Sequence, residues 1–234
     1  MPHGGRNLAA VASSSDNPSG RESKVASISG ILFGVFLVAT FASTYNFPAA
    51  PAQADATLAQ FSSLRTAFLA GNGFIGLAAV FAVPYFIGLR SAFNGKDRLL
   101  VGSATLLALA GIVVTAVVFI TATVALDVLS TAYATGGVTR TAAVIVAQAV
   151  IGLGSVEIFG FLVLAAGLGV YGFVTMRGKP FPRWLGYGGI LAAILSLVAA
   201  APVSGAFSAL IAGVVLILVW TFGTSGLMWR SRAP

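Results

Sequence analysis

Few side chains in this sequence could carry out chemistry. None of the 234 residues is a cysteine, and the single histidine, His3, lies in a polar amino-terminal segment. The apolar remainder therefore lacks the usual residues for thiolate or serine–histidine catalysis and for ligation of zinc or haem by histidine. It also contains no glycine-rich phosphate loop and no evident pair of carboxylates, so we expect no enzymatic activity, no cofactor and no metal site.

Glu157 is the acidic residue that lies well inside an apolar run, which extends from Thr141 to Met176. An ionisable side chain in such a run faces protein or water and often marks an ion pathway. Three roles fit it: an ion pair with Arg65 or Arg140 that acts as a structural tie, a proton-titrating or cation-binding site, and a solvated residue at a wet mouth. We take the ion pair as the first expectation.

Further polar residues are expected at the same end of the molecule as Glu157. Together with it they form a candidate polar site: Arg65, Asn72, Asp127, Arg140 and Gln148. Trp220 is a different kind of candidate, because it lies near the middle of an apolar segment with Thr221, Thr224 and Ser225 close in sequence. It either lines a pocket or fills the core of a helix bundle.

The composition indicates which elements must position these residues. Hydrophobic residues make up 58% of the chain, charged residues make up 8%, and the mean hydropathy is +0.97. An average soluble domain contains roughly 25% charged residues, so this composition predicts a membrane protein. The net charge of +7 would suit a nucleic-acid binder. We expect no nucleic-acid partner, however, because the cations are spread between apolar segments as topology signals are.

A helical crossing needs about 20 mostly apolar residues. Six segments qualify: Val25 to Phe47, Ala67 to Leu89, Leu99 to Leu126, Ala142 to Met176, Trp184 to Ser204 and Phe207 to Trp229. The predicted fold is an all-α, polytopic transmembrane bundle of six helices over residues 25–229. A disordered tail over residues 1–24 precedes it, and a short tail over residues 230–234 follows it.

The distribution of lysine and arginine predicts how the bundle is oriented. Eleven of these residues fall in the two tails and in the second and fourth loops, whereas only Arg65 and Arg140 fall on the opposite side. Cytoplasmic loops carry the excess of positive charge in multi-pass proteins. We therefore expect a multi-pass protein of the cell membrane with both termini in the cytoplasm.

The fourth segment is longer than one crossing requires. As a single helix it would measure about 50 Å, well beyond the roughly 30 Å of hydrocarbon. Either it tilts and protrudes, or it breaks, for which Gly152, Gly154 and Ser155 offer a site. A break would place Ala142 to Ile151 along the outer interface or in a re-entrant position, with Glu157 near the outer end of the crossing. A continuous helix would place Glu157 nearer mid-depth.

The first segment has a competing interpretation as a secretory signal, with a cleavage site after Ala54. Its apolar run is longer than that of a usual signal, so we expect the first helix to be retained. Pairs of small residues four positions apart predict close helix packing inside the bundle rather than between copies of it. These pairs are Gly30 with Gly34, Ala104 with Ala108, and Ala165 with Gly169.

The stretch "RGKPFPRWLGYGGILAAI", a last segment that ends in "WTFGTSGLMWR", and "PYFIGLRSAF" at the end of the second segment carry a family resemblance. The most specific part is Pro182, Arg183, Trp184, Leu185 and Gly186. The chain resembles, from about Val25 onward, prokaryotic six-helix integral membrane proteins known only as a domain of unknown function. The resemblance implies six helices and no particular activity.

Three classes of function remain open from the sequence. The first expectation is a non-enzymatic bundle that interacts with lipid or with a protein partner, and a homo-oligomer is not decided. The alternative is a small ion-coupled transporter or permease that uses Glu157. A membrane-embedded enzyme is the weakest of the three, because no catalytic constellation is present.

Overall fold

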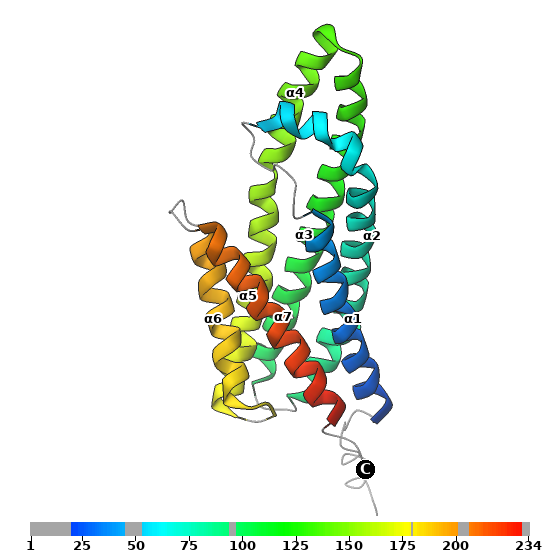
Figure 1. Ribbon diagram of the computed structural model, residues 1–234. Coiled ribbons are helices and arrows are strands. Elements are labelled where there is room, and N and C mark those ends of the chain that lie inside the picture. The colour runs from blue at the N-terminus through cyan, green and yellow to red at the C-terminus, as the bar shows by residue number, and fades with distance from the viewer. Residues whose placement is uncertain (1–19, 45–52, 94–96, 179, 201–205, 231–234) are drawn as a thin grey trace, which may run out of the picture.

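A computed structural model describes residues 20–44, 53–93, 97–178, 180–200 and 206–230. Within these ranges the chain forms seven α-helices and no strand (Figure 1). They are α1 (Gly20–Thr44), α2 (Ala54–Ala92), α3 (Arg98–Ala134), α4 (Gly137–Gly152), α5 (Gly154–Arg177), α6 (Arg183–Ala199) and α7 (Ala206–Arg230). The prediction of an all-helical protein is therefore confirmed.

Five of the helices, α1, α2, α3, α5 and α7, are long and apolar enough to cross a membrane. Helices α4 and α6, with 16 and 17 residues, are apolar but shorter. Five of the six predicted crossings thus correspond to long helices, and the sixth, Trp184 to Ser204, corresponds to the shorter α6. The part of that segment beyond Ala200 lies outside the described residues.

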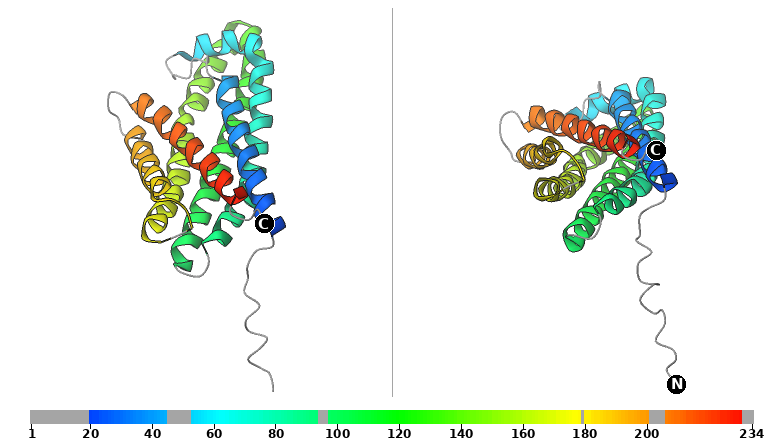
Figure 2. Two further views of the ribbon diagram at one scale, coloured as in Figure 1. Left: turned by 60° about the horizontal axis from the view of Figure 1, so that its bottom comes forward. Right: turned by 90° about the horizontal axis from the view of Figure 1, so that it is seen from below.

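The helices run alternately up and down the bundle. In Figure 1, α1 rises, α2 descends, α3 rises, α5 descends, α6 rises and α7 descends. Helix α7 lies diagonally across the bundle, so that its beginning packs on α6 and its end packs on α1 (Figures 1 and 2). The start of α1 and the end of α7 consequently meet at one end of the molecule, which we call the terminal end.

Helices α2 and α3 extend beyond the rest of the bundle at the opposite end. They contain 39 and 37 residues, which corresponds to about 58 Å and 55 Å at 1.5 Å per residue. The hydrocarbon core of a bilayer is only roughly 30 Å thick, so both helices are longer than one crossing requires. The surplus joins α4 in a projecting part that we call the hood: residues 54–68, 126–134 and 137–152 (Figure 1).

The hood has a hydrophobic core of its own. Leu58, Phe61, Phe68, Leu126 and Ala147 are buried in it, and the Phe61 and Phe68 rings lie 5.4 Å apart between centroids. Its tip is a tight turn between α3 and α4, where Gly136 and Gly137 have φ angles of 77° and 61°. Glycine adopts this left-handed backbone at no steric cost, so the pair ends α3 and reverses the chain.

The predicted fourth segment divides where the glycines suggested it could. Helix α4 ends at Gly152 and α5 begins at Gly154. The predicted course of the first part is wrong, however. Instead of lying along the interface or re-entering, α4 packs against the end of α3 and covers the core of the hood.

The small-residue faces lie inside the bundle, as predicted. A Cβ atom added at Gly30 would lie 2.5 Å from the Tyr85 ring, and one added at Gly34 would lie 2.7 Å from the Phe222 ring. Ala104, Ala108 and Ala165 are fully buried. These positions let the helices approach closely, which is how membrane helices gain packing energy.

Candidate functional site

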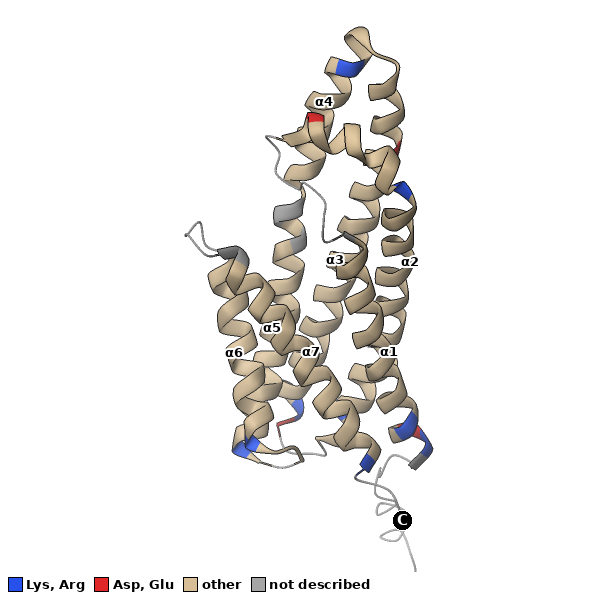
Figure 3. Ribbon diagram, viewed as in Figure 1, with Lys and Arg blue, Asp and Glu red and all other residues tan. Residues whose placement is uncertain are grey.

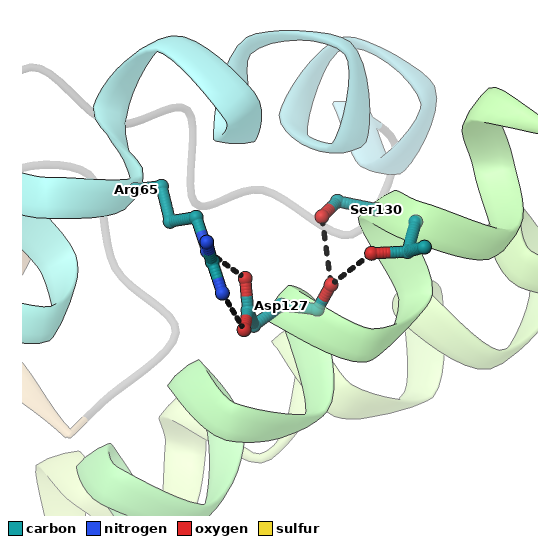
Figure 4. Close-up of polar contacts among 4 residues, drawn as sticks. Arg65, Asp127 and Ser130 are labelled. Atoms are coloured by element: carbon teal, nitrogen blue, oxygen red, sulfur yellow. Dashed lines mark hydrogen bonds and ion pairs between the residues drawn. The ribbon is translucent and has the colours of Figure 1, made fainter.

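The best-defined polar contact of the predicted site joins α2 to α3 in the hood. The guanidinium of Arg65 donates from Nε to Oδ1 of Asp127 over 2.7 Å and from Nη2 to Oδ2 over 3.0 Å (Figure 4). The backbone carbonyl of Asp127 in turn accepts a hydrogen bond from the Ser130 hydroxyl over 2.8 Å. The bidentate contact with Arg65 fixes the position of the Asp127 carboxylate and stabilises its negative charge.

A second ion pair joins α4 to the first turn of α2. Arg140 donates from Nη2 to Oδ1 of Asp55 over 3.1 Å and also bonds to the hydroxyl of Tyr133. The Arg140 guanidinium carbon lies 4.3 Å from the centroid of the Tyr133 ring. With the Arg65 pair, this contact ties all three helices of the hood together.

The charges of the hood are mutually compensating. Both pairs lie outside the predicted crossing segments, which begin at Ala67 on α2 and end at Leu126 on α3. The hydrogen bonds from Arg65 hold the pKa of Asp127 below its ordinary value of 3.8, and those from Arg140 and then Tyr133 lower the pKa of Asp55. At neutral pH the two arginines and two aspartates are therefore all ionised and cancel in charge.

The predicted polar site has three further residues, Glu157, Gln148 and Asn72. Glu157 belongs to α5, shortly after its start at Gly154, but its side chain lies outside the described residues. Gln148 is exposed on α4. Asn72 is half-buried on α2, and its Oδ1 atom has no hydrogen-bond partner within the described part of the chain. Arg65 and Arg140, the two arginines that the sequence offered to Glu157, bond to Asp127 and Asp55.

Trp220 fills the core of the bundle. Only 1% of its surface is exposed, and its ring lies 5.9 Å from that of Tyr171 between centroids. A Cβ atom at Gly189 would lie 3.2 Å from Trp220 Nε1, so this glycine leaves room for the indole. Of the two roles predicted for Trp220, the structure supports packing.

Buried hydroxyl groups form interhelical contacts that the sequence did not reveal. The Tyr85 hydroxyl lies 2.6 Å from Thr224 Oγ1, which joins α2 to α7. The Tyr171 hydroxyl lies 2.7 Å from Thr105 Oγ1, which joins α5 to α3. Each is an isolated polar residue in an apolar segment, so its partner is visible only after the helices are packed.

Charged side chains are confined to the two ends of the described bundle. Figure 3 shows lysine, arginine and acidic residues at the terminal end and in the hood, with a long uncharged zone between them. The helices of this zone expose large apolar side chains, including Leu106, Val117 and Leu197, at 58–71% of their surface. Such a zone suits contact with lipid. Within the described residues, no three histidine, aspartate or glutamate side chains gather as ligands for a metal.

Residues 28–230 match a family described as a domain of unknown function, DUF4386. The chain belongs to the DUF4386 family. The match runs from α1 to the end of α7, so both the bundle and the hood are parts of the DUF4386 domain. The predicted resemblance to a family of unknown function is thereby confirmed. No curated protein and no solved structure matches the chain.

Proposed function

We propose that this DUF4386 protein is an integral protein of the cell membrane that crosses the bilayer six times and works by binding lipid or a protein partner. The observation that carries the proposal is the uncharged, apolar-surfaced zone between two charged ends (Figure 3). Lipid is the solvent in which such a surface needs no protein cover.

In this proposal α6 is the crossing that adds to the five long helices, because the chain must return between α5 and α7. Helix α5 ends at the terminal end with Arg177, whereas α7 starts at the other end and descends. Helix α6 is the segment that returns the chain, and it exposes Leu191, Ile194 and Leu197 as a helix facing lipid would. Its 17 residues correspond to about 25 Å, close to the hydrocarbon thickness.

An excess of positive charge supports a cytoplasmic location for the terminal end. The described residues at this end include seven cations: Arg21, Lys24, Arg90, Arg98, Arg177, Arg183 and Arg230. Only Glu22 and Asp97 oppose them among described acidic residues there. In the hood, by contrast, both arginines are neutralised by aspartates. The imbalance follows the positive-inside rule and supports a location of the hood outside the cell.

Binding is favoured over catalysis by what the polar groups do. The ion pairs of the hood and the hydroxyl contacts of the bundle each join one helix to another. Their role is structural, and none is arranged as a nucleophile beside a base. Helix α1, with Phe33 and Leu37 fully buried, is an integral part of this bundle, so we propose that it is retained rather than cleaved.

Ion-coupled transport through Glu157 is the second candidate. It is favoured by the position of Glu157, an acidic residue near the start of the apolar helix α5. Ionisable residues within membrane-spanning segments often mark ion pathways.

Extraction of native membranes with alkaline carbonate tests the membrane assignment. A protein that spans the bilayer stays in the pellet. Release of the full chain into the supernatant would refute the proposal.

A further inference from the structure

A groove opens at the terminal end of the bundle, between the first turns of α1 and the last turns of α2 and α7. Its volume is about 770 Å³, and Pro180 and Phe181, between α5 and α6, line it as well. The lining includes apolar residues together with Arg21, Glu22 and Arg230, which belong to the cationic terminal end. A ligand in it would contact apolar and charged residues at the same time.

Part of the groove lining is apolar. Val25, Pro84, Ile87 and Leu227 belong to it, and Ile87 exposes 53% of its surface. The serines of the lining are already bonded, since Ser23 donates to the carbonyl of Met228 and Ser91 to that of Ile87. This part of the lining therefore offers an apolar surface rather than free hydrogen-bonding groups.

Charged residues complete the lining. Arg21 and Glu22 come from α1 and Arg230 comes from α7. Neither arginine forms an ion pair with a described residue, in contrast to Arg65 and Arg140 in the hood. Two positive charges and one negative charge leave the lining with a net charge of +1. Lys24, stacked 5.9 Å from the Trp229 ring centroid, adds a further cation nearby.

We propose that this groove binds one anionic phospholipid of the cytoplasmic leaflet. The phosphate would be held between Arg21 and Arg230, and the first part of an acyl chain would lie against Ile87 and Val25. A guanidinium pair is suited to phosphate oxygens, and basic pockets between membrane helices on the cytoplasmic side bind anionic headgroups. The net charge of the lining complements the single negative charge of phosphatidylglycerol.

Glu22 should affect the binding of an anionic lipid and of a zwitterionic lipid in opposite directions. Its carboxylate repels a headgroup with a net negative charge but would attract the ammonium of phosphatidylethanolamine. The substitution Glu22→Gln should therefore tighten binding of phosphatidylglycerol by roughly fivefold, since one charge near the headgroup contributes about that factor. Tighter binding of phosphatidylethanolamine than of phosphatidylglycerol by the unaltered protein would overturn the proposal.

Native mass spectrometry of the full chain, released from detergent after incubation with each lipid, measures retention directly. We expect one retained phosphatidylglycerol, and a 10- to 30-fold weaker affinity, roughly, in the double variant R21Q/R230Q. The matched control R98Q/R183Q removes the same charge from the same end outside the groove and should stay within about twofold of the unaltered protein. Equal losses in the two double variants would overturn the proposal.

A photo-crosslinking amino acid at Ile87 identifies the occupant in membranes. An adduct with phosphatidylglycerol supports the proposal, whereas an adduct with residues 1–19, with another protein or equally with phosphatidylcholine overturns it. The assignment to the cytoplasmic leaflet rests on the proposed threading. Lipid retention in detergent does not depend on sidedness, so a failure of the threading and a failure of the groove give different results.

Discussion

Ser23, in the first turn of α1, donates a hydrogen bond over 3.1 Å to the carbonyl oxygen of Met228, in the last turn of α7. The first and last helices therefore meet at one end of the molecule. A bundle whose terminal helices meet in this way crosses a membrane an even number of times. This contact accordingly favours six crossings over five. The side of the membrane on which the terminal end lies then decides the topology.

The Arg65–Asp127 pair should stabilise the hood locally rather than the whole protein. Because both side chains are partly exposed, we expect the substitution Arg65→Gln to speed amide hydrogen exchange over residues 126–134 by roughly two- to fivefold. The exchange of α5 should not change. The charge-swapped variant R65D/D127R should recover part of the protection, whereas no recovery would mean that charge pairing is not the cause.

Gly111 should tolerate no side chain. A Cβ atom there would clash with the backbone nitrogen of Leu164 and lie 2.6 Å from the carbonyl oxygen of Gly160, so α3 and α5 would have to separate. We expect Gly111→Ala to cost about 1–3 kcal/mol and to lower the apparent melting temperature in detergent. Gly102→Ala, on the same helix with no atom within 4 Å of the added Cβ, is the control and should be neutral or slightly stabilising. Equal melting of the two variants would contradict the observed packing of α3 on α5.

The Tyr85 hydroxyl should contribute to the attachment of α7. It lies 2.6 Å from Thr224 Oγ1 in the buried core. Removal of the hydroxyl in Tyr85→Phe should cost about 1 kcal/mol, a typical value for hydrogen bonds between membrane helices. Thermal unfolding of the purified protein measures it. Tyr187→Phe removes a hydroxyl from a residue that is 59% exposed and should leave the melting temperature unaltered. A Tyr85→Phe variant as stable as this control would argue against a stabilising contact.

Glu157 separates the proposed binding function from the second candidate. If the protein does not couple ions, Glu157→Gln should leave both the proton flux into vesicles and the melting temperature unaltered. An internal pH-sensitive dye reports the flux. Asp97→Asn, at the terminal end, serves as the control carboxylate. A loss of proton flux that is specific to Glu157→Gln, in a variant that folds normally, would favour ion-coupled transport.

Much of the bundle could be predicted because lipid restricts the structures that an apolar segment can form. Apolar runs of sufficient length become helices whatever their neighbours are, and small residues mark where helices touch. Gly30, Gly34 and Ala104 illustrate this, since all three lie at interfaces inside the bundle. The Gly152–Gly154 interruption was also visible, because two glycines with one residue between them weaken a helix.

The hood could not be predicted from apolar run lengths. The third predicted crossing ends at Leu126, yet residues 127–134 continue α3 before Gly136 and Gly137 reverse the chain. The Arg140–Asp55 pair depends on this hairpin. Once α4 returns along α3, Arg140 lies within reach of Asp55, and Arg65 pairs with Asp127 from the neighbouring helix. The crossing pattern places Arg65, Asp127 and Arg140 at the same end of the molecule, but it does not show which carboxylate each arginine contacts.

Single-cysteine labelling in intact cells tests the threading most directly, because the chain has no cysteine of its own. Val138, at the tip of the hood, is 88% exposed, and a Cβ atom at Gly178, at the terminal end, would meet no atom within 4 Å. With a membrane-impermeant maleimide, Val138→Cys should react in intact cells and Gly178→Cys only after permeabilisation. The reverse pattern, or reaction of both variants in intact cells, would contradict a six-crossing protein with its hood outside.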